Sequence, residues 1–121
     1  MKTEHEKVDQ ASEQRQGTRY FVSRHPGAIA WARRHPWGKT LDVVSHLDPA
    51  TVTRNDTVIG TLPIHLVAAI CARGAIYLHL ELSLAAHQRG RELSADDLAA
   101  AGAFLRVYHA ELRSIPPFRW K

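Results

Sequence analysis

The chain has 121 residues, a formal net charge of +4 and a hydrophobic fraction of 45%. That length suits one domain with a core of its own. The modest basic excess favours an anionic partner but is far below the charge of a histone-like protein, so we expect no DNA binding.

Several classes of site lack their sequence signals. The chain has one cysteine, Cys71, so an internal disulfide is impossible, and its apolar neighbours indicate a buried position. No glycine-rich dinucleotide motif, phosphate-binding lysine loop or zinc-type histidine spacing is present. No apolar run has membrane-spanning length, and the N-terminus lacks a signal-peptide pattern. We therefore expect a cytoplasmic protein without a metal, a cofactor or a membrane partner.

The first seventeen residues differ from the rest in composition. They contain almost no large apolar side chains, which predicts a disordered leader over residues 1–17 and a single domain over residues 18–121. The domain carries thirteen basic side chains against eight acidic ones, and eleven of the basic ones are arginine. Arginine suits the planar, two-point recognition of phosphate.

The domain begins with a strand, a polar turn and a helix. Residues 19–23 are rich in aromatic and β-branched side chains and predict a strand. Pro26 and Gly27 then start a helix that continues to residue 34. The N-terminus of such a helix attracts anions, and Ser23, Arg24 and His25 lie beside it in the sequence. An ordinary turn whose polar residues only face water is an equally good interpretation.

The middle of the chain predicts three more strands and a second helix. Residues 41–47 and 57–60 indicate strands, with one helical turn between them after Pro49. Residues 64–72 indicate a helix closed by Gly74, and residues 75–82 a fourth strand. That strand alternates, with Tyr77, His79 and Glu81 on one face, so this face is less buried or meets a second subunit.

The last third of the domain predicts a loop and a long helix. Ser94, with Asp97 three residues later, is typical of a capping box. Residues 98, 101, 105, 108 and 112 are apolar or aromatic and follow helical spacing, so we expect one helix that runs to the prolines at 116 and 117. Trp120 in the tail could fold back or lie in an interface.

The predicted element order, β-α-β-β-α-β-α, favours a small Rossmann-like α/β domain. We expect a mostly parallel four-stranded sheet in the order 2-1-3-4 with helices on both faces. The direction of winding reverses between the first and third strands, and ligands of such sheets bind beyond the strand C-termini there. The turns at this point are SRHPGA and GTLPIH, each with a proline near the helix start and a histidine close by.

These turns and the neighbouring loops supply the candidate site. In the first turn, His25 could move a proton, Arg24 could neutralise phosphate charge and the Ser23 hydroxyl could contact a ribose. The other candidates are ligand-binding residues on the same expected edge of the sheet: Pro26, Gly27, His46, Gly60, Thr61, Leu62, His65, Arg89 and Arg91. For His46 and His65 a purely structural role is equally compatible with the sequence, and Arg89 and Arg91 could belong to a solvated loop.

Several motifs in order resemble one known family. FVSRHPGAIAWARR, HLDP, DTVIGTLPIHLVAAICARGAIYLHLEL and RGRELSADDL are similar to the small type III CRISPR-associated Csx proteins of the "Csx-sixteen" family. The resemblance runs from about Thr18 to about Leu112. It implies a ring nuclease that cleaves cyclic oligoadenylate, the second messenger of type III effector complexes, and it falls on the two turns and on Arg89, Gly90 and Arg91.

This resemblance implies a mechanism and a partner. The ring ligand carries one negative charge per nucleotide and is symmetric, so we expect a homodimer that binds it across a two-fold axis. Attack by a ribose 2′-hydroxyl needs no metal and leaves a 2′,3′-cyclic phosphate. Two alternatives stay open at this point: a sponge that binds the ring without cutting it, and an accessory module that binds another protein through its Trp-containing tail.

Overall fold

A five-stranded sheet forms the centre of the domain, in the order β2-β1-β3-β4-β5. The computed structural model describes residues 17–84 and 90–114, so most of the predicted leader, Arg89 and the Trp120 tail lie outside the described residues. The elements in chain order are β1 (Arg19–Val22), α2 (Pro26–Arg33), η1 (Pro36–Gly38), β2 (Asp42–Val44), η2 (Pro49–Thr51), β3 (Thr57–Gly60), α3 (Ile64–Ala72), β4 (Ile76–Glu81), α4 (Ala95–Ala100) and β5 (Phe104–Tyr108).

The predicted α/β fold and the order of the first four strands are confirmed. These four strands are parallel, with Phe21 of β1 paired to both Val43 of β2 and Ile59 of β3. β3 is buried at all four positions, as its short apolar sequence predicted. The expected strand over residues 41–47 is shorter, since β2 covers only Asp42–Val44.

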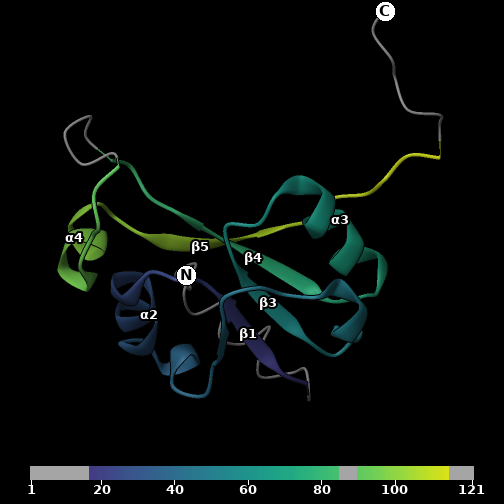
Figure 1. Cartoon of the computed structure of the whole chain (residues 1–121), viewed down its shortest axis with the longest axis horizontal. Coiled ribbons are helices and arrows are strands. Elements are labelled where there is room, and N and C mark those ends of the chain that lie inside the picture. Colours follow the sequence, from purple (N-terminus) through teal and green to yellow (C-terminus); the bar gives the residue numbers. More distant parts are fainter. Residues whose placement is uncertain (1–16, 85–89, 115–121) are drawn as a thin grey trace, which may run out of the picture.

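Helices cover both faces of the sheet (Figure 1). One hydrophobic core lies between the sheet and the helices α2 and α4. Its largest side chains are Phe21, Trp31, Trp37, Ile59, Leu78 and Leu105. The second core lies under α3 and η2 and includes Val52, Val58, Val67, Ile70, Cys71 and Tyr77. Cys71 is thus a small core residue, as its apolar neighbours indicated.

The long C-terminal helix was a wrong prediction. α4 ends at Ala100, and Gly102 adopts φ +73°, a left-handed conformation that closes the helix. The chain then returns as β5, which pairs antiparallel to β4, so the sheet has five strands and is mixed. Leu105 faces the α2 core while its neighbours Phe104 and Arg106 point the other way, a period of two that the helical spacing concealed.

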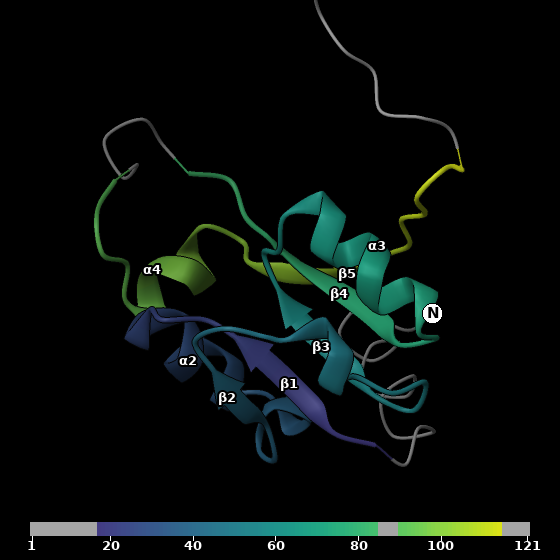
Figure 2. The same cartoon turned by 45° about the vertical axis from the view of Figure 1, so that its right-hand side comes forward.

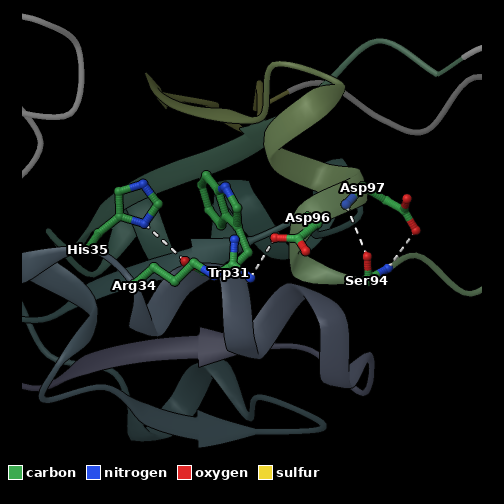
Figure 3. A network of polar contacts seen from close by, with 6 residues as sticks. All are labelled: Trp31, Arg34, His35, Ser94, Asp96 and Asp97. Atoms are coloured by element: carbon green, nitrogen blue, oxygen red, sulfur yellow. Dashed lines mark hydrogen bonds and ion pairs between the residues drawn. The ribbon is translucent and has the colours of Figure 1, made fainter.

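Figure 3 shows the polar contacts around α2 and α4, of which one ion pair joins the two helices. Ser94 and Asp97 form the predicted capping box, with the Ser94 Oγ accepting from Asp97 N–H at 3.0 Å and the Asp97 carboxylate accepting from Ser94 N–H at 2.9 Å. These hydrogen bonds lower the pKa of Asp97 below its usual value. Arg34, at the end of α2, pairs with Asp96 at 2.8 Å. The segment just before α4 therefore has a defined place beside α2.

Candidate functional site

The predicted reversal point is present at the C-terminal ends of β1 and β3. The two strands are parallel neighbours; β1 continues into α2 on one face of the sheet and β3 into α3 on the other (Figure 2). A cleft of about 200 Å³ lies at this edge on the α2 side, and we call it the α2 cleft. Its lining includes five of the predicted site residues: Ser23, His25, Gly60, Thr61 and Arg91. The remaining lining is mostly apolar and comes from β1, β4 and the α4 region.

His25 takes the extended conformation predicted for a residue before proline. It is the N-cap residue of α2, with φ −94° and ψ 114°, and its backbone N–H donates to the Ser23 Oγ at 3.1 Å. Its imidazole Nδ1 lies 3.4 Å from the Glu92 carboxylate, and both side chains are largely exposed. The ring therefore lies at the mouth of the cleft, next to an acidic partner from a distant part of the sequence.

Arg24 and His46 form a pair beside this cleft. The Arg24 guanidinium lies 3.1 Å from the His46 Nε2, and since arginine can only donate, His46 accepts. His46 follows β2, so the pair bridges the ends of β1 and β2. Neither residue lines the α2 cleft, but Arg24 precedes His25 directly, which keeps its charge at the same edge of the sheet.

Two glycines of the predicted site serve the packing of the chain itself. A Cβ on Gly27 would lie 1.7 Å from the carbonyl oxygen of Leu93, so this glycine admits the backbone that leads into α4. A Cβ on Gly60 would lie 3.0 Å from the carbonyl oxygen of Val22. Pro26 occupies the first turn of α2, as predicted. Both glycines thus allow protein backbone to approach closely, and Gly60 also lines the α2 cleft.

The remaining candidates are not in the α2 cleft. Leu62 lines a separate groove on the α3 side of the sheet, and His65 is exposed on α3, where it lines a hollow with residues 109–112. These two residues therefore follow the same strand end as Thr61 but lie on the other side of the sheet, because the chain crosses to that face after Thr61. Arg89 lies outside the described residues, so its predicted contact is not described.

The α3 groove is the larger cavity, with a volume of about 640 Å³. It is lined by Leu62, Ile64, Val67, Tyr77, His79, Leu80, Glu81, Leu82, Tyr108, His109 and Ala110. Leu80 and Leu82 also line the α2 cleft, so the two cavities adjoin at the end of β4. The sequence showed the alternation of Tyr77, His79 and Glu81, but not the groove, because its second wall is β5, which was taken for helix.

A chain of polar contacts runs through this groove. The Tyr77 hydroxyl is bonded to the backbone of the β3–α3 turn, accepting from Leu62 N–H at 2.9 Å and donating to the Gly60 carbonyl at 3.1 Å. It also lies 2.7 Å from the His79 Nδ1. Burial raises the pKa of the Tyr77 hydroxyl above its usual value, although the Leu62 contact opposes this.

The outer end of the groove holds a second polar group. Tyr108 donates a short hydrogen bond to the Glu81 carboxylate, and this bond raises the pKa of the Tyr108 hydroxyl. Arg106 pairs with the same carboxylate at 3.5 Å and stacks over Phe104. The Tyr108 and His79 rings meet edge to face at 5.6 Å.

Two further kinds of site have no counterpart in the part of the chain that the structure describes. Within residues 17–84 and 90–114, no three His, Cys, Asp or Glu side chains lie together as metal ligands would. None of the helices there has the length and apolar character needed to cross a bilayer.

The comparison with protein families identifies the chain. Residues 20–111 match the family described as "Putative CRISPR-associated protein (Cas_VVA1548)". The chain belongs to this family. The match begins in β1 and ends beyond β5, so it includes the α2 cleft, the α3 groove and the Arg24–His46 pair. No curated protein and no solved structure matches the chain.

Proposed function

We propose that this CRISPR-associated protein is a ring nuclease that binds cyclic oligoadenylate, with the tetra-adenylate as its preferred ring, and cleaves it. The observation that supports this proposal is the α2 cleft, where Ser23, His25, Thr61 and Arg91 converge at the reversal point of the sheet. Two hydroxyls, an imidazole and a guanidinium match what a phosphodiester needs at a cutting site. The family of the chain is CRISPR-associated, and the resemblance of its motifs to the Csx-sixteen family supports the second messenger of type III systems as the anionic ligand.

The proposed reaction is a transesterification within the ring. A ribose 2′-oxygen bonds to the adjacent phosphorus, its proton leaves, the bond from phosphorus to the 5′-oxygen breaks, and that oxygen gains a proton. His25 carries a proton at this phosphate, and the α2 cleft orients the attacking hydroxyl in line with the departing oxygen. Arg91 and Arg24 stabilise the charge that develops on phosphorus. Neither the attack of the 2′-oxygen nor the departure of the 5′-oxygen needs a metal.

The proposal includes a homodimer. A cyclic ligand with internal symmetry can contact the same site on two copies of the chain, so each copy contributes one α2 cleft. The exposed apolar side chains of Val107 and Leu112 would then be available for contact with the other copy.

The deciding experiment is an incubation of the pure full-length chain with labelled cyclic tri-, tetra- and hexa-adenylate in EDTA. We expect cleavage to products that end in a 2′,3′-cyclic phosphate, and light scattering of the same sample to give a dimer. Rings with 2′-O-methyl groups should bind but stay intact, because their nucleophile is blocked. Binding without cleavage of any ring would identify a sponge, and an absolute need for Mg²⁺ would point to water as the nucleophile.

Arg24→Ala is expected to weaken binding of the 2′-O-methyl ring, because it removes a positive charge beside the α2 cleft. The affinity of the parent chain should also fall as salt rises, since arginine–phosphate contacts displace counterions, and the slope should be shallower in the variant. Arg54→Ala is the matched control, because Arg54 is exposed in the turn before β3, at the opposite end of the sheet. Equal effects of the two substitutions would remove Arg24 from the site.

A further inference from the structure

The α3 groove has the dimensions of a ligand site that the α2 cleft lacks. Small-molecule sites usually enclose roughly 300–1,000 Å³. The α3 groove, at about 640 Å³, falls in that range, whereas the α2 cleft, at about 200 Å³, falls below it. The two cavities adjoin at Leu80 and Leu82, so a ring held by its phosphate in the cleft can place a neighbouring unit in the groove.

The contacts of the Tyr77 hydroxyl favour one tautomer of His79. A tyrosine hydroxyl has one hydrogen, and Tyr77 gives it to the Gly60 carbonyl. With that hydrogen on Gly60, all three contacts of the hydroxyl are satisfied when the His79 Nδ1 donates to it at 2.7 Å. In a neutral imidazole the other nitrogen, Nε2, then keeps its lone pair. In this tautomer the His79 Nε2 is a hydrogen-bond acceptor, and the β3–α3 turn favours it through Tyr77.

Apart from its tyrosines and His79, the groove is mostly apolar, with Glu81 and His109 as its other polar lining residues. Leu62, Ile64 and Val67 form an aliphatic wall on the α3 side. At the outer end, the Tyr108 ring is 44% exposed and offers a stacking surface. Its hydroxyl donates to Glu81, a carboxylate that can only accept. A matching ligand has a flat apolar ring and an N–H group that points at β4.

We propose that the α3 groove is a binding subsite for an adenine base, whose 6-amino group donates to the His79 Nε2 and whose ring stacks on Tyr108. Adenine combines the flat ring with an exocyclic amino group. Hypoxanthine has a carbonyl oxygen in place of the amino group. That oxygen and the His79 Nε2 would then face each other as two hydrogen-bond acceptors. The identity of the natural ligand, an adenine of the cyclic oligoadenylate, rests on the function proposed above. The subsite itself does not depend on ring cleavage.

The test uses AMP and IMP as probes of the full-length chain, with binding followed by NMR titration. We expect AMP to shift the signals of Leu62, His79 and Tyr108 and to bind about tenfold more tightly than IMP, since one hydrogen bond is lost and an acceptor pair is created. Equal affinities for the two nucleotides, or no shift of these signals at the solubility limit of AMP, would overturn the subsite.

Variants of the groove separate recognition of the amino group from general loss of structure. His79→Asn retains an amide nitrogen at the position of Nδ1 for Tyr77 but has no atom at the position of Nε2, so the preference for AMP over IMP should fall close to one. Tyr108→Leu should weaken both nucleotides and leave their ratio unchanged. Arg54→Ala should change neither value. A retained tenfold preference in His79→Asn would contradict the assignment.

The outcome is independent of the test of cleavage. A preference for AMP together with an uncleaved ring would retain the adenine subsite and reject the nuclease. Ring cleavage without AMP preference would do the reverse.

Discussion

His25→Ala is expected to lower the rate of ring cleavage by about 10²–10⁴-fold, the usual contribution of a positioned acid or base. The imidazole lies at the mouth of the α2 cleft, and its backbone is held extended by Pro26 and by the hydrogen bond to Ser23. The effect should appear in single-turnover rates with saturating protein. Binding of the 2′-O-methyl ring should change much less, because the phosphate contacts of arginine remain.

A second substitution distinguishes proton transfer from simple positioning. The Glu92 carboxylate lies 3.4 Å from the His25 Nδ1. Glu92→Gln should reduce the rate by less than His25→Ala, since the imidazole stays in place. If His25→Ala left the cleavage rate within the range of Arg54→Ala, His25 would have no part in the chemistry, and the proton carrier would have to lie elsewhere on this edge of the sheet.

Local signals in the sequence predicted most of the fold. The valine, isoleucine and glycine run of β3, the helix closed by Gly74 and the proline at the start of α2 are each decided within a few residues, and the structure confirms them. The strand order also followed, because two βα units that wind in opposite directions have few arrangements. The capping box at Ser94 was confirmed for the same local reason.

The C-terminal strand shows where such signals conflict. The apolar positions from Leu98 to Leu112 follow helical spacing, but Gly102 interrupts them, and the aromatic and β-branched residues beyond it also alternate. Pairing with β4 buries Leu105 completely, which outweighs the weak helical preference of this stretch. An edge strand of this kind is stabilised by its neighbour, so its own residues predict it poorly.

The candidate site likewise has a part that local sequence predicted and a part that it did not. The residues of the SRHPG turn are adjacent in sequence, and their common location at the end of β1 was predictable. The contact of His25 with Glu92 and the bonds of Tyr77 to the Gly60–Leu62 turn join residues that are distant in the sequence. No spacing rule predicts such pairs. The α3 groove was missed because its second wall, β5, was expected to be helix, although each polar residue of the groove on β4 was noted.

Gly27→Ala is expected to destabilise the fold by about 3 kcal/mol, the upper end of what an overpacked position usually costs. Its Cβ would lie 1.7 Å from the Leu93 carbonyl oxygen and 2.8 Å from the Leu93 carbonyl carbon. Backbone atoms cannot rotate away as a side chain can, so either α2 or the segment before α4 has to move. Urea denaturation measures the loss as a lower free energy of unfolding.

Gly102→Ala is the matched control for this substitution. Gly102 has open space around it but a φ of +73°, so alanine there meets only backbone strain, which costs about 1 kcal/mol. A loss for Gly27→Ala no larger than that of Gly102→Ala would mean that the α2–α4 contact is loose. If Gly27→Ala loses more stability than Gly102→Ala, ring cleavage should fall as well. A shift of Leu93 also displaces Arg91, which lines the α2 cleft, and Glu92, which lies beside His25.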